Sequence, residues 1–93
     1  MAVGLVTLEL HLVQAHSLKD KRQVLERLKN RLRARFNVSV AELDHQELWQ
    51  RATVGIVSIS NTQAHLAQTL EAVAAESERI LGDDLTETHI EFL

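Results

Sequence analysis

The sequence predicts one α+β domain in which four strands and two helices follow the order β-α-β-β-α-β. Three features predict this order: alternating polar and apolar residues near both ends of the chain, two long segments with helical apolar spacing, and a pair of β-branched segments between them. With 93 residues, the chain is long enough to enclose one core and too short for two. We therefore assign residues 1–93 to a single domain.

The first strand and the first helix are the elements that the pattern defines best. Residues 4–13 alternate between apolar and polar side chains, which is typical of a half-buried strand. Ser17 is suited to cap the following helix, and Asp20 stands three residues later, as in a weak capping box. Leucines at helical spacing then carry the helix to about Arg35.

The pattern in the middle of the chain predicts a β-hairpin. Residues 38–43 and 49–59 are rich in β-branched and apolar side chains, and the polar run 44–47 separates them. The two segments are therefore expected to be antiparallel neighbours joined by a polar turn.

A second helix and a last strand complete the order. Ser60, Asn61 or Thr62 is placed to cap the helix, and Gly82 is placed to end it. The chain alternates again from Leu85. The apolar stripe of the second helix consists of Leu66, Leu70, Val73 and Ile80.

Two helices that each connect strands, with one hairpin between them, match the split βαβ arrangement of the ferredoxin-like sandwich. Right-handed crossovers then place both helices on one face of an antiparallel sheet with the strand order 4-1-3-2. The expected core joins six helical residues to six strand residues: Leu25, Leu28, Leu32, Leu66, Leu70 and Val73 against Val6, Leu8, Leu10, Val54, Ile56 and Ile90.

Composition restricts the possible chemistry. The chain has no cysteine, so thiolate metal sites, disulfides and cysteine nucleophiles are excluded. A hydrophobic share of 45% with 25% charged residues is globular and leaves no stretch apolar enough for a membrane span. No basic residue precedes Lys19, so a secretory signal is not expected. We expect a cytoplasmic protein with no cofactor and no membrane partner.

Positive charge is concentrated in the first helix. Eight of the ten lysines and arginines lie between Lys19 and Arg35, against only Asp20 and Glu26, so this segment carries +6 in a chain with a net charge of −3. Such asymmetry favours a polyanionic partner, although a solvated helix face would show the same pattern. At helical spacing, the candidate nucleic-acid-binding residues on one flank are Lys19, Arg22, Lys29 and Arg33, and Arg27 and Arg31 lie on the other side.

The expected topology also brings polar residues together at one end of the sheet. We call this set the polar edge: His16, Ser17, Lys19, Lys21, Asp44, His45 and Gln46. A helix N-terminus with adjacent lysines is suited to an anion or another small ligand. The alternative is structural, with Ser17 as a cap, Asp44 and Gln46 as turn residues, and His45 in solvent.

Two further features have a structural and a functional interpretation. Trp49, the only tryptophan, is expected to pack in the core, and base stacking is the alternative. Histidine with carboxylate on adjacent strands is a zinc-capable combination, but alternating polar residues are the ordinary outer face of a sheet, and no metal site is assigned. The residues concerned are Glu9, His11, His89 and Glu91.

Three uncommon strings, at residues 15–22, 35–42 and 44–51, resemble the small bacterial YlxP-like proteins, a family of unknown function. The resemblance spans nearly the whole chain. It implies a ferredoxin-like fold and gene neighbours that often include translation initiation and ribosome-binding factors. It implies no activity and no catalytic residue.

Three classes of function follow from these features. The first is an accessory protein that binds RNA or ribosomal particles through the basic helix. The second is a protein-interaction or self-associating domain that uses an outer sheet face containing Leu5 and Val57. The third is an enzyme for a phosphorylated or acylated small molecule, acting at His16, Lys19, Asp44 and His45, but no motif fixes a nucleophile with its base.

Overall fold

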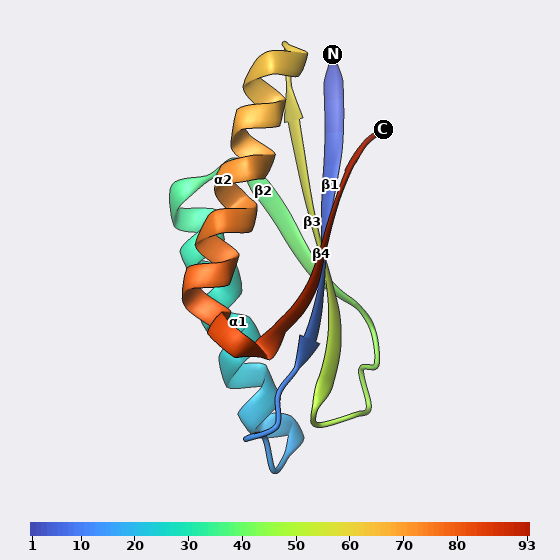
Figure 1. The fold of residues 1–93 in the computed structure, drawn as a ribbon, viewed down its shortest axis with the longest axis vertical. Coiled ribbons are helices and arrows are strands. Elements are labelled where there is room, and N and C mark those ends of the chain that lie inside the picture. Colours follow the sequence, from blue (N-terminus) through green and yellow to red (C-terminus); the bar gives the residue numbers. More distant parts are fainter.

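Four antiparallel strands form one sheet in the order β2-β3-β1-β4, which confirms the predicted order (Figure 1). The computed structural model describes residues 1–93. Its elements are β1 (Ala2–His11), α1 (Leu18–Arg35), β2 (Val38–Asp44), β3 (Arg51–Ser60), α2 (Gln63–Leu81), a short 3-10 turn (Gly82–Asp84) and β4 (Leu85–Phe92).

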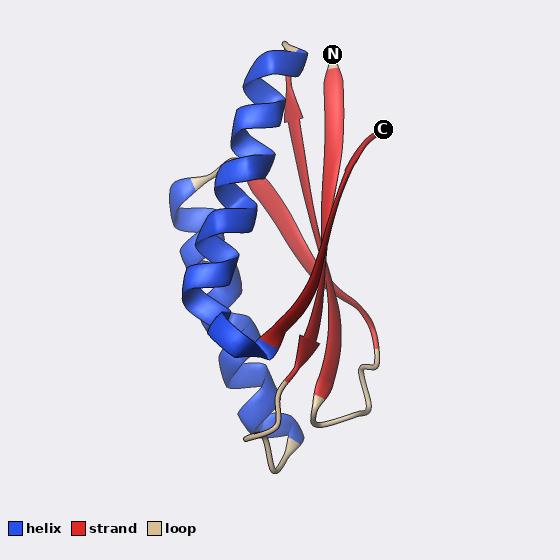
Figure 2. Ribbon diagram, viewed as in Figure 1, coloured by secondary structure: helices blue, strands red, loops and turns tan.

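Both helices cover the same face of the sheet, as the right-handed crossovers require (Figure 2). The opposite face carries no helix. This asymmetry explains why the inward residues of β1 are buried while its outward residues stay half-exposed. Neither helix is both long enough and apolar enough to cross a membrane.

The core lies where β1, the central strand, meets both neighbours under the helices. Val6 pairs with Ile56 of β3 on one side and with Ile90 of β4 on the other. Ten of the twelve predicted core residues are buried, and Leu25 and Ile90 pack against them while partly exposed. Burial of this apolar surface is the main favourable contribution to folding.

Local hydrogen bonds fix the helix ends. Ser17 Oγ accepts a hydrogen bond from the backbone N–H of Asp20 at 3.1 Å, and Asp20 Oδ2 accepts one from the backbone N–H of His16 at 2.9 Å. Thr62 caps α2, its hydroxyl accepting from the backbone N–H of His65. Gly82 ends α2 with a φ of 56°, a conformation that favours glycine.

The hairpin differs from the prediction at its second strand. β3 begins at Arg51, two residues later than expected, so Trp49 belongs to the connection between β2 and β3. We call residues 45–50 the hairpin loop. His45 opens this loop with a φ of 64°, and its backbone N–H donates to Asp44 Oδ1 at 2.7 Å. The polar turn is therefore longer than the sequence pattern indicates.

Two buried strand glycines offer a matched test of packing on the two faces of the sheet. A Cβ at Gly4 would lie 2.5 Å from Cδ1 of Leu70, which is fully buried between α2 and the sheet. A Cβ at Gly55 would lie 2.7 Å from Cδ1 of Leu43, whose side chain is 53% exposed and free to move aside. We expect Gly4→Ala to lower the free energy of unfolding by about 1–3 kcal/mol, as overpacked cores do.

Gly55→Ala is the control for that measurement, because it makes the same chemical change in a strand. Its cost should stay below about 1 kcal/mol, since Leu43 rotates into solvent and alanine suits a strand better than glycine. Urea denaturation of both variants measures the difference. Equal losses would show that the two faces resist a methyl group equally and would contradict the difference between buried Leu70 and exposed Leu43.

Candidate functional site

The ammonium group of Lys21 lies inside the protein and joins α1 to the hairpin loop. It donates hydrogen bonds to the carbonyl oxygens of His45 at 2.8 Å, Gln46 at 3.3 Å and Arg51 at 3.2 Å. The Lys21 side chain is 1% exposed. Each of the three ammonium protons therefore has a carbonyl acceptor. Glu42 Oε2 lies 2.8 Å from Lys21 Nζ and balances the positive charge, but it accepts no hydrogen bond.

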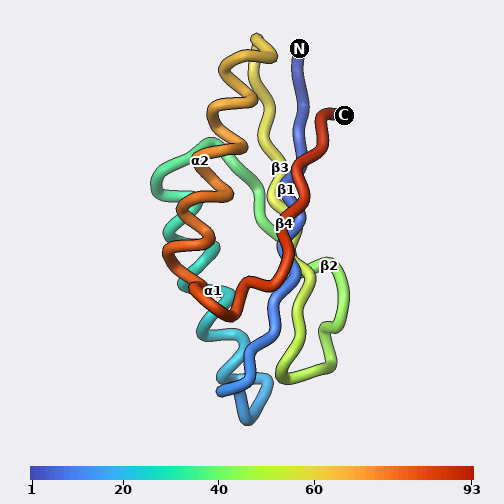
Figure 3. The backbone as a smooth tube through the Cα atoms, viewed as in Figure 1, coloured from blue at the N-terminus to red at the C-terminus, as the bar shows by residue number.

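A second set of contacts ties the hairpin loop to the connection between β1 and α1. Gln50 Nε2 donates to the carbonyl oxygens of Val13 at 3.3 Å and Ala15 at 3.2 Å, and the Leu12 N–H donates to the Gln50 carbonyl at 2.8 Å. The two connections therefore lie side by side at the end of the sheet where α1 begins (Figure 3). The polar edge contains residues from both connections, such as His16 from the first and His45 from the second.

Within the polar edge, the structure gives each residue a distinct position. Ser17 and Asp44 are occupied by local backbone hydrogen bonds, and Lys21 is internal, so its ammonium does not face an external anion. His16, Lys19 and Gln46 are exposed, and His45 is half-buried. Neither the His16 nor the His45 imidazole hydrogen-bonds a hydroxyl, so this edge contains no paired nucleophile and base.

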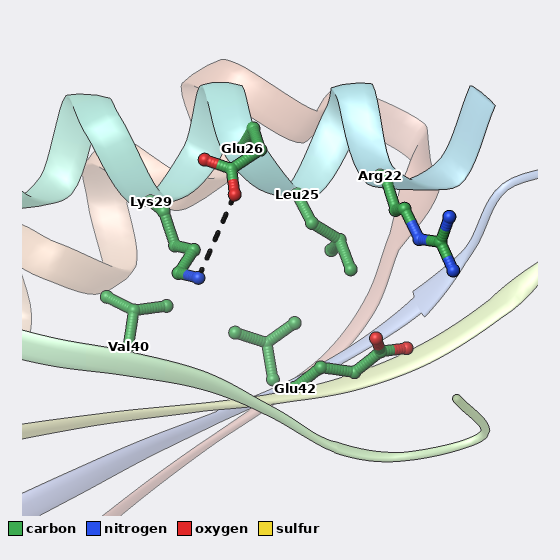
Figure 4. Close-up of a pocket in the computed structure, with 7 residues that line it drawn as sticks. Arg22, Leu25, Glu26, Lys29, Val40 and Glu42 are labelled. Atoms are coloured by element: carbon green, nitrogen blue, oxygen red, sulfur yellow. Dashed lines mark ion pairs between the residues drawn. The ribbon is translucent and has the colours of Figure 1, made fainter. Parts of the chain in front are cut away.

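A pocket of about 240 Å³ opens between α1 and β2 (Figure 4). Its apolar wall consists of Leu25, Val40 and Val54, and the charged residues Arg22, Glu26, Lys29 and Glu42 surround that wall. Lys29 Nζ lies 3.9 Å from Glu26 Oε1. Arg22 and Lys29 of the predicted basic flank therefore reach one pocket, whereas Arg33 is exposed further along α1.

The other flank of α1 faces α2. Arg27 and Arg31 line a cleft of about 220 Å³ between the helices together with Arg79 and Ile80 of α2. The sequence did not associate Arg79 with the basic helix, because 44 or more residues separate them and only helix packing brings them together. Positive charge thus continues across the helix pair at this point.

Glu76 is the acidic residue that links the two helices. It is buried, with Oε2 at 2.6 Å from Arg35 Nη1 and Oε1 at 3.5 Å from Arg79 Nη2. These two arginines neutralise an internal carboxylate, which costs less than leaving it unpaired. Arg35 and Arg79 are therefore engaged within the protein.

The histidines and carboxylates of the outer sheet face are spread along β1 and β4. Glu9 Oε1 accepts a hydrogen bond from Thr53 Oγ1 at 2.6 Å, and His89 Nε2 lies 3.0 Å from Glu87 Oε1. Glu91 pairs in register with Leu5. No group of three or more such side chains in the structure could hold a metal ion.

Trp49 lies on the surface, so the expectation that it packs in the core is wrong. Its side chain is 52% exposed. The reason is its position in the hairpin loop, where no strand alternation directs it toward the helices. It lines a shallow pocket of about 500 Å³ with His11, Glu47, Leu48, Gln50 and Arg51.

A four-stranded antiparallel sheet with two helices on one face and this strand order defines a ferredoxin-like α+β protein. A de novo designed protein with a ferredoxin fold matches the whole chain and 83% of its own length at a TM-score of 0.60, with 8% identity. A putative antibiotic biosynthesis monooxygenase from Bordetella bronchiseptica matches 100% of the chain and 96% of its own at a TM-score of 0.52, with 15% identity. At such identities these structures establish the fold alone.

The chain belongs to the family described as protein of unknown function (DUF503), whose model matches residues 3–90. It is also similar to the uncharacterized protein YlxP of Bacillus subtilis strain 168. The two are 37% identical over 73 residues, which cover 78% of this chain and 79% of the relative. The resemblance to YlxP-like proteins is therefore confirmed.

The buried Lys21 offers a direct test of this arrangement. Lys21→Met keeps most of the volume but leaves Glu42 without a counter-ion and three carbonyls without a donor. We expect the free energy of unfolding to fall by about 2–4 kcal/mol, near the lower end for a broken buried pair because Glu42 keeps some contact with water. Chemical denaturation measures the loss, and amide exchange at Leu48 reports whether the hairpin loop has opened.

Lys19→Met is the matched control, since Lys19 is exposed in the same helical turn. It should change the free energy of unfolding by less than about 0.5 kcal/mol. Combining Lys21→Met with Glu42→Met should cost less than the sum of the single changes, because the double variant leaves no buried charge. Strict additivity would argue against the ion pair.

Proposed function

We propose that this protein is an RNA-binding accessory factor that contacts RNA phosphates through the exposed face of α1. The observation that carries the proposal is the number of unpaired cations on this helix. No carboxylate oxygen lies within 4.0 Å of five of its basic side chains: Lys19, Arg22, Arg27, Arg31 and Arg33. Free cations on one helix release counter-ions when they neutralise a polyanion.

The position of α1 supports this use of its charge. Only Lys21, Leu28 and Leu32 of its 18 residues are buried, so most of the helix faces solvent. The outer sheet face is a poorer surface for RNA, because Glu87 and Glu91 are exposed there and its strands carry no outward phenylalanine, tyrosine or tryptophan. We therefore place the phosphate contacts on the helix rather than on the sheet.

Within α1, the flank of Lys19, Arg22, Lys29 and Arg33 is the preferred surface. The opposite flank adjoins α2, whose exposed carboxylates, Glu71 and Glu78, repel phosphate, while Glu76 is already neutralised by arginines. On the preferred flank, Glu26 Oε1 lies 3.9 Å from Lys29 Nζ and neutralises that charge only weakly. The Glu42 carboxylate is neutralised by Lys21. The gene neighbours that the YlxP-like resemblance implies make ribosomal RNA the first RNA to test.

A salt titration tests the proposal quantitatively. The logarithm of the affinity for single-stranded ribosomal RNA fragments should fall linearly with the logarithm of salt concentration, with a slope of about −0.7 for each phosphate contact. Replacing Arg22 and Arg33 together by glutamine should make that slope shallower by about 1.4 units. Fluorescence anisotropy of labelled RNA measures the slope, and sedimentation with ribosomal subunits tests the natural particle.

The matched control is the double change of Arg27 and Arg31 to glutamine, which removes the same charge from the flank facing α2. It should affect the slope less. Equal losses in both double variants would indicate diffuse attraction to the whole helix rather than a preferred flank. If neither RNA nor ribosomal subunits bind at low salt, the proposal is rejected.

Self-association through the bare sheet face is the second candidate function. The observation that favours it is a set of exposed apolar side chains on that face, Leu43, Val57 and Ile59. Two copies that pack these faces together would bury that apolar surface.

Sedimentation equilibrium decides whether copies associate in this way. A dimer that uses this face should dissociate when Val57 is changed to glutamate, because the charge would be buried at the interface. The exposed change Gln68→Glu on α2 adds the same charge outside that face and should leave the dimer intact. A monomer at all concentrations would exclude this candidate.

A further inference from the structure

The only tryptophan of the chain stands at an exposed position that the core does not require. Trp49 and its neighbour Leu48 are 52% and 48% exposed, and both belong to the hairpin loop. Burial of an indole contributes strongly to stability, and about half of the Trp49 surface remains exposed to solvent. A half-exposed indole therefore suggests a surface that is completed by a ligand.

The hairpin loop holds Trp49 in a defined place. Lys21 binds two carbonyls of the loop and the carbonyl of the first β3 residue. The Gln50 amide binds the other end to the carbonyls of Val13 and Ala15, and the Leu48 N–H donates to the His45 carbonyl at 3.0 Å. The entropy of ordering this loop is lost on folding and not again on binding. Trp49 is thus presented as a preorganised contact.

The residues around Trp49 suit a flat polar ligand better than an apolar protein segment. The pocket combines the indole with the guanidinium of Arg51, the imidazole of His11 and the carboxylate of Glu47. Arg51 has no carboxylate within 4.0 Å, so its charge is available. Protein interface centres are depleted of charged residues, whereas nucleobases stack on tryptophan and hydrogen-bond to charged groups at their edges.

We propose that Trp49 is a stacking platform for one base of single-stranded RNA. Arg51 lies beside it to meet a phosphate or a base carbonyl, and the Glu47 carboxylate accepts hydrogen bonds from a base amino group. This inference rests on the proposed RNA binding and adds a base contact to the phosphate contacts of α1. The hairpin loop and the start of α1 lie at the same end of the molecule (Figure 1). Lys19 is the second residue of α1.

The fluorescence of Trp49 reports the contact directly, because the chain contains one tryptophan and no tyrosine. We expect a ten-nucleotide oligo(A) at low salt to quench Trp49 emission with the same midpoint as the anisotropy of a labelled copy. Trp49→Ala should weaken binding by at least about five-fold, and Trp49→Phe should retain most of the affinity, since stacking contributes about 1–3 kcal/mol per base.

Leu48→Ala is the matched control, because it truncates an equally exposed apolar neighbour in the same loop. It should change RNA affinity by less than two-fold if stacking, rather than general apolar contact, is responsible. Far-UV circular dichroism should be unchanged in all three variants, and urea denaturation should show that each remains folded under the binding conditions, since the altered side chains lie in a surface loop.

The possible outcomes separate this inference from the proposed function. Salt-dependent RNA binding without quenching, and with Trp49→Ala binding as well as the unaltered protein, overturns the platform and leaves the α1 proposal standing. Quenching whose salt slope is unchanged when Arg22 and Arg33 are replaced by glutamine supports the platform and counts against the α1 flank. A concentration-dependent blue shift of Trp49 emission without RNA would show that a second copy covers the indole, which also overturns the platform. Absence of any RNA binding at low salt rejects both.

Discussion

The buried ammonium of Lys21 is the interaction on which the arrangement of this end of the molecule depends. One cation donates hydrogen bonds to two carbonyls of the hairpin loop and one at the start of β3, and it lies 2.8 Å from the Glu42 carboxylate of β2. Burying a charge is costly, and the cost is offset only when its partners are complete. Because all three ammonium protons have acceptors here and Glu42 balances the charge, the first turn of α1 and the hairpin loop are fixed relative to each other.

The two helices contribute unequally to the buried core. α2 buries six of its 19 residues and packs Leu66, Leu70 and Val73 over the sheet, whereas α1 buries three of 18. A helix that contributes so little to the core has many solvent-facing positions, and α1 fills them with basic side chains. The same asymmetry that makes α1 a minor contributor to the core makes it the surface available to a polyanion.

The cations of the protein fall into two groups once their partners are known. Lys21, Arg35 and Arg79 neutralise buried or half-buried carboxylates, and their role is structural. The unpaired cations of α1 and Arg51 have no such role. The proposed phosphate and base contacts rest on these cations and on the indole of Trp49, since single-stranded nucleic acids are bound by combining the two kinds of contact.

The sequence by itself determined the element order, the topology, the cap of α1 and most of the core, because alternation, helical spacing and capping depend on residues close together in the chain. For α2 it left three candidate caps, of which the structure uses Thr62. It also determined that the polar segments converge, since the topology delivers them to one end. A signal for Lys21 was present: it lies four residues before Leu25 and seven before Leu28, on the apolar stripe.

Only the tertiary structure decided how individual polar and aromatic side chains are used. Lys21 turned inward because the hairpin loop offers carbonyls at that point, and Arg79 joined Arg27 and Arg31 because the two helices pack together. Trp49 stayed exposed because β3 begins two residues after it. Each of these results depends on contacts between segments distant in the chain, and the local periodicity of a sequence does not encode such contacts.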